Sequence, residues 1–278
     1  MCSVAYAAER KREASLWVTS LFLFFWLSVL SHDIAAKCND DLSSGYHSVG
    51  VLKSIYDGDT LTLKDGRKIR LIGINTPEMG RKQRLAEPLA LEAKLFLQSL
   101  LMVGEPVQLR IGQQRKDHYG RILAHVFTEK GENVTAKLLR KGYGYQVLIA
   151  PNAWGESCYL QAEQLARAER AGVWGHPYYA VRGANSVSLR AGFALISGEV
   201  EGIFLAKNAV WIDLVGKIVL RIPKDNWQQF QSVRRQLIPG QELEARGWLI
   251  DRKKTGKTLK KHRKRWMIKI NHPGSLVL

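Results

Sequence analysis

Two short runs of alternating apolar and polar residues flank the turn Asp65-Gly66-Arg67, and this pattern restricts the first half of the chain most strongly. The alternation begins near Val49 and continues through Leu71 and Ile74. A period of two places every second side chain on one face of a strand, and an Asp-Gly turn between two such runs is typical of an antiparallel hairpin. The chain is therefore expected to start its folded part with a half-buried sheet.

The register expected for this hairpin gathers oxygen-bearing side chains at its open end. If Leu63 faces Ile69, the apolar side chains share one face. The same register brings Asp59 to the open end and places Asp57 opposite Asn75. Carboxylate and amide oxygens are hard ligands that suit Ca²⁺ or Mg²⁺ better than softer metals. A divalent-cation site is therefore expected where the hairpin opens.

The rest of this half alternates between helical and strand patterns. Proline in a first helical turn and glycine beyond a last one mark the helix ends. Helices are predicted over residues 88–101, 133–141 and 156–171, and further strands over residues 107–111 and 122–127. The periodicity then fails between His176 and Gly192, which indicates a linker, assigned to residues 179–194.

A second unit is predicted over residues 195–278. Its strands are expected at residues 195–205, 210–214, 218–222, 243–250 and 266–270, with one helix after Asp225, between the third and fourth. Three strands, a helix and two strands follow the order of a five-stranded OB barrel. The expected fold is mainly β with helices (α+β), an OB-type barrel with three packed helices followed by a second small OB-like five-stranded barrel.

Basic residues concentrate in the loop between the last two predicted strands. The whole chain carries 42 Lys and Arg against 25 Asp and Glu, a formal net charge of +17, which attracts polyanions. In OB barrels this loop commonly contacts nucleic acid. Its expected substrate-binding residues are Lys253, Lys254, Lys260, Lys261 and Arg263, with stacking faces from Trp211, Trp248 and Trp266. The alternative is a solvated basic hairpin over a barrel whose tryptophans form the core.

The N-terminal segment has the features of an export signal. Basic residues precede an apolar run from Leu16 to Leu30, and small residues follow it as far as Ala36. Residues 1–36 are interpreted as a secretory signal peptide, with an uncleaved membrane anchor as the alternative. Cys38 and Cys158 allow one disulfide after export, although Cys158 on an apolar helix face favours a buried free thiol. No Cys/His cluster has the spacing of a zinc site.

Three blocks of the chain resemble the staphylococcal nuclease family in order and spacing. They are Asp57-Gly58-Asp59-Thr60, the stretch from Arg70 to Glu78 that ends in Thr76-Pro77-Glu78, and Asp117-His118-Tyr119-Gly120-Arg121. The similarity covers about residues 49 to 175. It implies a nuclease domain, assigned to residues 45–178, with an OB-type barrel. The flat hairpin described above leaves Arg70 on the face opposite the acidic residues, so only the resemblance assigns it a role.

The resemblance implies roles for individual residues of these blocks. Ca²⁺, with Mg²⁺ as the alternative, would be held by Asp59, the Asn75 side chain and the Thr76 carbonyl. Arg70 and Arg121 would contact the reacting phosphate, and Glu78 would act as the base or orient the attacking water. Tyr119 would stack near a base or sugar, and His118 would join the substrate-binding residues with less positive charge than the usual lysine.

One departure from the family pattern leaves the activity open. Asn75 stands where the family usually has an aspartate, so one negative charge is lost and weaker metal binding is expected. The leading hypothesis is an exported, metal-dependent nuclease that cleaves DNA or RNA with low sequence specificity. One alternative is a non-catalytic nucleic-acid-binding protein that keeps the nuclease fold, and another is a protein that binds anionic lipid surfaces. No obligate protein partner is inferred.

Overall fold

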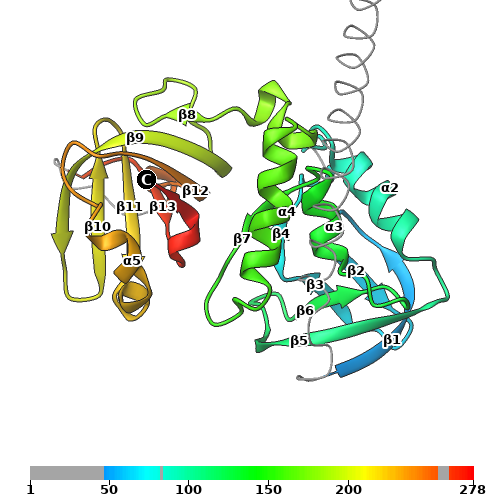
Figure 1. The fold of residues 1–278 in the computed structure, drawn as a ribbon. Helices are drawn as coiled ribbons and strands as arrows, with labels where there is room; N and C mark the ends of the chain where they lie inside the picture. Colours follow the sequence, from blue (N-terminus) through cyan, green and yellow to red (C-terminus); the bar gives the residue numbers. More distant parts are fainter. Residues whose placement is uncertain (1–46, 82–83, 256–262) are drawn as a thin grey trace, which may run out of the picture.

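The protein is described here by a computed structural model that covers residues 47–81, 84–255 and 263–278. Two β-barrels stand side by side, the first built from the blue to green part of the chain and the second from the yellow to red part (Figure 1). Each barrel encloses a hydrophobic core of its own. The predicted signal or anchor over residues 1–36 lies outside the described residues.

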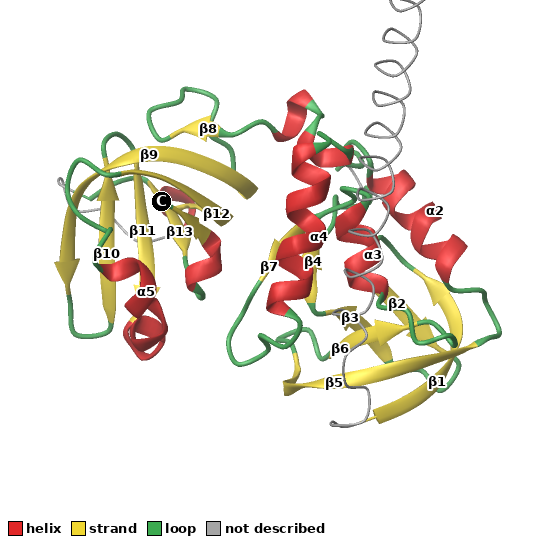
Figure 2. Ribbon diagram, viewed as in Figure 1, coloured by secondary structure: helices red, strands yellow, loops and turns green. Residues whose placement is uncertain are grey.

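The first barrel closes from five strands in the order β1-β2-β3-β6-β5. The strands are β1 (His47–Ile55), β2 (Thr60–Leu63), β3 (Lys68–Leu71), β5 (Pro106–Lys116) and β6 (Ile122–Phe127). Its helices are α2 (Ala90–Leu100), α3 (Val134–Arg140) and α4 (Glu156–Ala168) (Figure 2). The predicted barrel with three packed helices is confirmed. Alternating residues of the first hairpin fill its core because their side chains point to the same face.

The register of the first hairpin differs from the expected one by two residues. Leu61 pairs with Ile69, where the sequence predicted Leu63 in that place. The turn closes one residue earlier than expected, because Leu63 N–H donates to the carbonyl of Arg67 over 2.9 Å. A shift of two residues keeps every side chain on its face of the sheet. The apolar face was therefore predicted correctly although the pairing was wrong.

The chain leaves the barrel directly after β3. Gly73 has a φ of 88°, a left-handed conformation that glycine adopts without steric cost. A Cβ at this position would lie 2.4 Å from the ring of Tyr159. The strand β4 (Gly73–Asn75) then pairs with β7 (Tyr145–Val147) in a separate small sheet, with Asn75 opposite Tyr145. The predicted pairing of Asn75 with Asp57 is therefore wrong.

The second barrel closes in the order β9-β10-β11-β13-β12, with β12 also paired to β9. The strands are β9 (Gly192–Leu205), β10 (Ala209–Leu214), β11 (Ile218–Pro223), β12 (Glu242–Asp251) and β13 (Trp266–Lys269). The short strands β8 (Arg182–Gly183) and β14 (Leu276–Val277) extend its sheet. The predicted helix is mostly a 3₁₀ helix (Lys224–Phe230) that runs into the single turn of α5 (Gln231–Arg234). The predicted five-stranded OB-like barrel is confirmed.

Cys158 on α4 is buried and disulfide-bonded. The prediction of a free thiol is therefore wrong, and the partner cysteine lies outside the described residues. None of the helices in the described part of the chain is long and apolar enough to cross a membrane.

The two barrels are joined by a buried ion pair. Arg246 on β12 donates from Nη1 to Oε2 of Glu163 on α4 over 2.5 Å, and the two side chains are 6% and 3% exposed. The other oxygen of Glu163 accepts the Gln146 N–H over 2.6 Å. A second pair, Arg167–Glu244, spans the same interface at 2.9 Å. The carboxylate of Glu163 is therefore satisfied from both barrels.

Replacing Arg246 should lower the stability of the folded protein. Arg246→Leu leaves the Glu163 carboxylate buried without its cation, and the free energy of unfolding should fall by about 3–5 kcal/mol. The matched control is Arg167→Leu at the more exposed pair of the same interface, with an expected loss of about 1 kcal/mol or less. Urea denaturation measures both, and equal losses would show that burial of the pair does not matter.

A buried histidine makes the first barrel sensitive to acid. His125 is 1% exposed, and its Nδ1 lies 2.7 Å from the Tyr159 hydroxyl. Burial, aided by the charge of Arg110, lowers the pKa of His125 from 6.5 to about 3. Between about pH 6.5 and 3, His125 is therefore protonated in the unfolded chain and neutral in the folded chain.

The resulting stability is complete above about pH 6.5 and is lost as the pH falls toward 3. The loss from this group should be about 1.4 kcal/mol per pH unit. Urea denaturation between pH 7 and 5 measures the slope, and NMR reports the His125 ring directly. A ring that titrates near pH 6.5 in the folded protein would contradict the prediction.

Candidate active site

The loop between β1 and β2 is shaped by its acidic residues and its glycine. Oδ1 of Asp57 accepts the N–H of Asp59 over 3.1 Å, which closes a tight turn. A Cβ on Gly58 would lie 2.8 Å from both Ala93 Cβ and Thr76 Oγ1. The middle position of the Asp-Gly-Asp motif therefore has no room for a side chain, because the loop packs directly on α2 and on the chain after β4.

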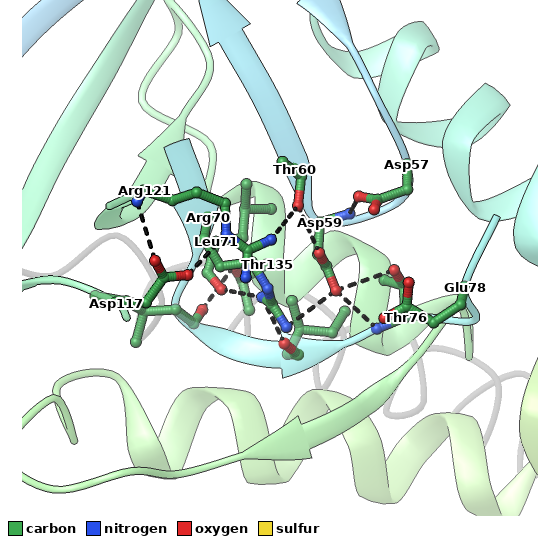
Figure 3. Close-up of polar contacts among 12 residues, drawn as sticks. Asp57, Asp59, Thr60, Arg70, Leu71, Thr76, Glu78, Asp117, Arg121 and Thr135 are labelled. Carbon is green, nitrogen blue, oxygen red and sulfur yellow. Dashed lines mark hydrogen bonds and ion pairs between the residues drawn. The ribbon is translucent and has the colours of Figure 1, made fainter. Parts of the chain in front are cut away.

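Asp59 is the centre of the site (Figure 3). Its Oδ2 accepts hydrogen bonds from the N–H and the Oγ1 of Thr76, each over 3.1 Å. The same oxygen lies 3.1 Å from Nη2 of Arg70. Oδ1 accepts the Thr60 hydroxyl over 3.0 Å. This carboxylate is 5% exposed, and its partners replace the water that it loses on burial.

Arg70 reaches Asp59 from β3, contrary to the flat-hairpin expectation. Asp59 lies in the loop before β2, so the alternation of the strand does not set its direction. Nη1 of Arg70 also donates to the carbonyl of Ile74 over 2.9 Å. The guanidinium is therefore held by main-chain and side-chain oxygens, and it is largely buried.

Arg121 comes to the same place from the turn between β5 and β6. Asp117 holds it there, because Oδ2 accepts from Arg121 Nε over 2.7 Å and Oδ1 accepts the Arg121 N–H over 3.0 Å. Nη1 of Arg121 donates to the Thr60 hydroxyl over 3.1 Å. The two arginines assigned by resemblance thus converge on the Asp59–Thr60 pair, Arg70 from β3 and Arg121 from the turn before β6.

Sequence reasoning missed two residues of this arrangement. Thr60 bridges Asp59 and Arg121, and Asp117 orients the Arg121 guanidinium. The role of Asp117 could have been predicted from sequence. An Asp four residues before an Arg, with a glycine turn between them, can accept hydrogen bonds from a backbone N–H of the turn and from the Arg side chain. No local pattern pointed to Thr60, because its partner is 61 residues away in the chain.

Burial and the nearby charge of Asp59 raise the pKa values of two acidic groups of the site, Asp57 and Glu78. Burial, then the negative charge of Asp59, raises the pKa of Asp57 to about 7. The pKa of Glu78 is also raised, first by loss of surrounding water and then by the charges of Asp59 and Glu87. Glu78 follows Thr76 and Pro77 at the open rim of the site (Figure 3). Negative charge is therefore concentrated here beyond what Arg70 offsets.

A hard divalent cation fits the chemistry of these residues. A cation beside Asp57 and Asp59 would offset the repulsion that raises the Asp57 pKa, and carboxylate oxygens are suitable ligands. Within residues 47–81, 84–255 and 263–278, however, no three His, Cys, Asp or Glu side chains converge on one ion position. Asn75 is buried opposite Tyr145, and no contact found among these residues joins its side chain to Asp59.

The remaining predicted residues form two separate surfaces. Tyr119 is 73% exposed beside Arg121, with the His118 ring centroid 3.7 Å from its own. Lys253 and Lys254 are exposed after β12, and Arg263 is exposed before β13. Lys260 and Lys261 lie outside the described residues. The structure therefore places Tyr119 and His118 beside the Asp59 site and the basic loop on the second barrel.

The three tryptophans of the second barrel that were predicted to stack on bases differ in exposure. Trp266 is 7% exposed and belongs to the core, which contradicts its predicted stacking role. The guanidinium of Arg252 lies 5.6 Å from the ring centroid of Trp211. Trp248 is 41% exposed and has its ring edge-on to Phe193. Stacking on a base thus requires Trp211 or Trp248.

Comparison with known proteins adds independent information on the first barrel. The sequence profile of the family described as Staphylococcal nuclease homologue matches residues 68–176. Endonuclease YhcR of Bacillus subtilis is 30% identical over 136 residues, which are 45% of this chain and 11% of that protein. The thermonucleases of Staphylococcus hyicus and Staphylococcus intermedius are 32% and 31% identical over 123 and 127 residues. These alignments cover 43% and 45% of this chain and 72% and 74% of the thermonucleases.

The close packing around Gly58 can be tested directly. Gly58→Ala forces a methyl group against Thr76 and Ala93, and overpacking of this kind costs about 1–3 kcal/mol. The matched control is Gly183→Ala, since a Cβ there meets nothing within 4 Å. Urea denaturation should show a loss for Gly58→Ala and little change for the control. Equal stability of the two variants would mean that the loop moves aside without cost.

Proposed function

The chain belongs to the staphylococcal nuclease family, and on that premise we propose that it hydrolyses the phosphodiester bonds of DNA or RNA with low sequence specificity. One observation carries the proposal. Arg70 from β3 and Arg121 from the turn before β6 meet at the Asp59–Thr60 pair, with Glu78 close by on the far side of Thr76. Such a pair of guanidinium groups beside carboxylates suits a reaction at a phosphate.

The arginines bind and stabilise the reacting phosphate. Hydrolysis builds negative charge on the phosphate oxygens, and guanidinium groups placed in advance stabilise that charge without reorganising. Arginine suits this role because its planar donors can engage two oxygens at once. Asp117 and the carbonyl of Ile74 hold the two groups in place before substrate arrives.

Glu78 is proposed to orient the attacking water and to take its proton. A general base works best when its pKa lies near the working pH, and the surroundings of Glu78 shift its pKa in that direction. The residue follows Thr76 and Pro77, and its N–H donates to Oε2 of Glu87 over 3.1 Å. This contact fixes the backbone that carries the base.

A divalent cation, Ca²⁺ or Mg²⁺, is proposed as the cofactor of this site. Asp59, the Asn75 side chain and the Thr76 carbonyl are the residues that would hold it, with Asp57 beside them, and the ion would supply further stabilisation of charge on the phosphate. Asn75 offers one charge fewer than the aspartate usual in the family, so weak affinity is part of the proposal. The raised pKa of Asp57, caused first by burial and then by the charge of Asp59, supports a cation here, because a cation would favour the charged carboxylate.

The second barrel is proposed to add affinity for the nucleic-acid chain. Exposed Lys253, Lys254 and Arg263 gather in one loop region, and phosphate contacts of this kind are independent of sequence. Export is proposed from the N-terminal pattern. The disulfide at Cys158 supports an oxidising compartment, in which disulfides persist.

The proposal is tested by cleavage of single-stranded DNA and RNA with Ca²⁺, with Mg²⁺ and with a chelator. Glu78→Gln should lower kcat by about 10²- to 10⁴-fold, because it removes the proton acceptor. The matched control Glu92→Gln changes an exposed carboxylate on α2 and should behave as the unmodified protein. Asn75→Asp should lower the Ca²⁺ concentration needed for half-maximal rate.

One alternative function is favoured by a specific observation. Asn75 in place of a carboxylate is compatible with a protein that binds nucleic acid without cleaving it. Tight, salt-sensitive binding with no cleavage under any of these conditions would establish that alternative and refute the nuclease proposal.

A further inference from the structure

A cavity of about 230 Å³ lies between the two barrels beside the candidate active site. Asn75, Thr76 and Pro77 line one side of it, and residues of the segment between the barrels line the other. Thr76 is shared, because its N–H and hydroxyl hold Asp59. A molecule seated in this cavity therefore touches the chain segment that shapes the active site.

Two arginines of the connecting segment face this cavity without a carboxylate partner. Arg182 donates to the carbonyl of Tyr178 over 3.3 Å, and the guanidinium of Arg190 lies 3.9 Å from the Tyr178 ring centroid. Within the described residues neither forms an ion pair. A third arginine of the lining, Arg84, is paired with Glu87, the one acidic residue of the lining, at 2.8 Å.

The two arginines also repel one another. Burial and the charge of Arg190 both lower the pKa of Arg182. Like charges held together in a partly enclosed place raise the energy of the empty site, and an anion between them offsets that repulsion. The lining thus has the electrostatic character of an anion site.

A hydrogen bond and aromatic packing fix the walls of the cavity. The Tyr179 hydroxyl donates to the carbonyl of Pro88 over 2.6 Å, which ties the connecting segment to the first barrel. Tyr145 from β7 stacks on Phe193 from β9 with ring centroids 5.2 Å apart. The segment predicted from sequence only as a linker is therefore a wall of a preformed site, which lowers the cost of binding.

We propose that this cavity is a subsite for the substrate strand, in which Arg182 and Arg190 bind a backbone phosphate next to the one being cleaved. The proposal rests on the proposed nuclease function. The shared residue Thr76 links the two positions, and the planar guanidinium groups suit a phosphate. The second barrel then contributes directly to the active-site groove, in addition to its basic loop.

The test compares short and long substrates in the full protein. The Arg182→Gln/Arg190→Gln double variant should raise the KM for a single-stranded oligonucleotide about tenfold, with a smaller effect on a dinucleotide that has one phosphodiester. The salt dependence of KM should also become less steep, because fewer phosphates are neutralised. Arg190→Gln alone, at an exposed position, should show part of the effect without risk to folding.

The matched control is Arg235→Gln, which removes the same charge from an exposed arginine that does not line the cavity. Its KM should equal that of the unmodified protein. An unchanged KM in the double variant, or an equal rise for dinucleotide and oligonucleotide, would overturn the subsite. If the unmodified protein cleaves neither substrate, the nuclease proposal fails by itself. The subsite is then judged by oligonucleotide binding in chelator, where equal Kd values for protein and double variant would overturn it.

Discussion

The buried carboxylate of Asp59 is the contact on which the arrangement of the candidate active site depends. A carboxylate removed from water is costly unless donors replace its hydration, and here Thr60, Arg70 and Thr76 supply them. Thr60 and Arg70 lie on the two strands of one hairpin, β2 and β3, and Thr76 follows β4. Satisfying one side chain therefore fixes the loop before β2, the end of β3 and the chain that leaves β4. Arg121 joins through Thr60, so the two guanidinium groups proposed to bind phosphate are positioned by contacts within the protein itself.

The ion pair between the barrels helps to set their relative orientation, as Asp59 sets the arrangement of the candidate active site. The Glu163–Arg246 pair is nearly inaccessible to solvent, and a buried ion pair adds little net stability compared with apolar packing. Its geometry is nevertheless demanding, because a displaced barrel leaves both charges unpaired. The pair and the Tyr145–Phe193 stack therefore favour one orientation of the barrels. That orientation creates the cavity beside Thr76, so the second barrel bears on the proposed chemistry as well as on affinity.

Most elements of the fold followed from local patterns, and the errors have identifiable causes. The strands of both barrels were predicted within a few residues, because a period of two directly reports a half-buried strand. The first hairpin was misregistered by two residues because its turn closes between Leu63 and Arg67. Cys158 was interpreted as a free thiol because helical periodicity reports burial and says nothing of a covalent partner. The helix predicted in the second barrel is largely a 3₁₀ helix, because in so short a segment tertiary packing outweighs local helix propensity.

By itself the sequence determined the two barrels, the apolar faces of their strands and the identity of the residues in the three nuclease-like blocks. The tertiary structure alone decided which of these residues meet. Gly73 turns the chain out of the barrel, so that Asn75 pairs with Tyr145, while Arg70 comes to Asp59. The reason is physical. Side-chain periodicity is set by the backbone of one strand, whereas contacts between distant segments depend on where each strand ends and on which buried charges must find partners.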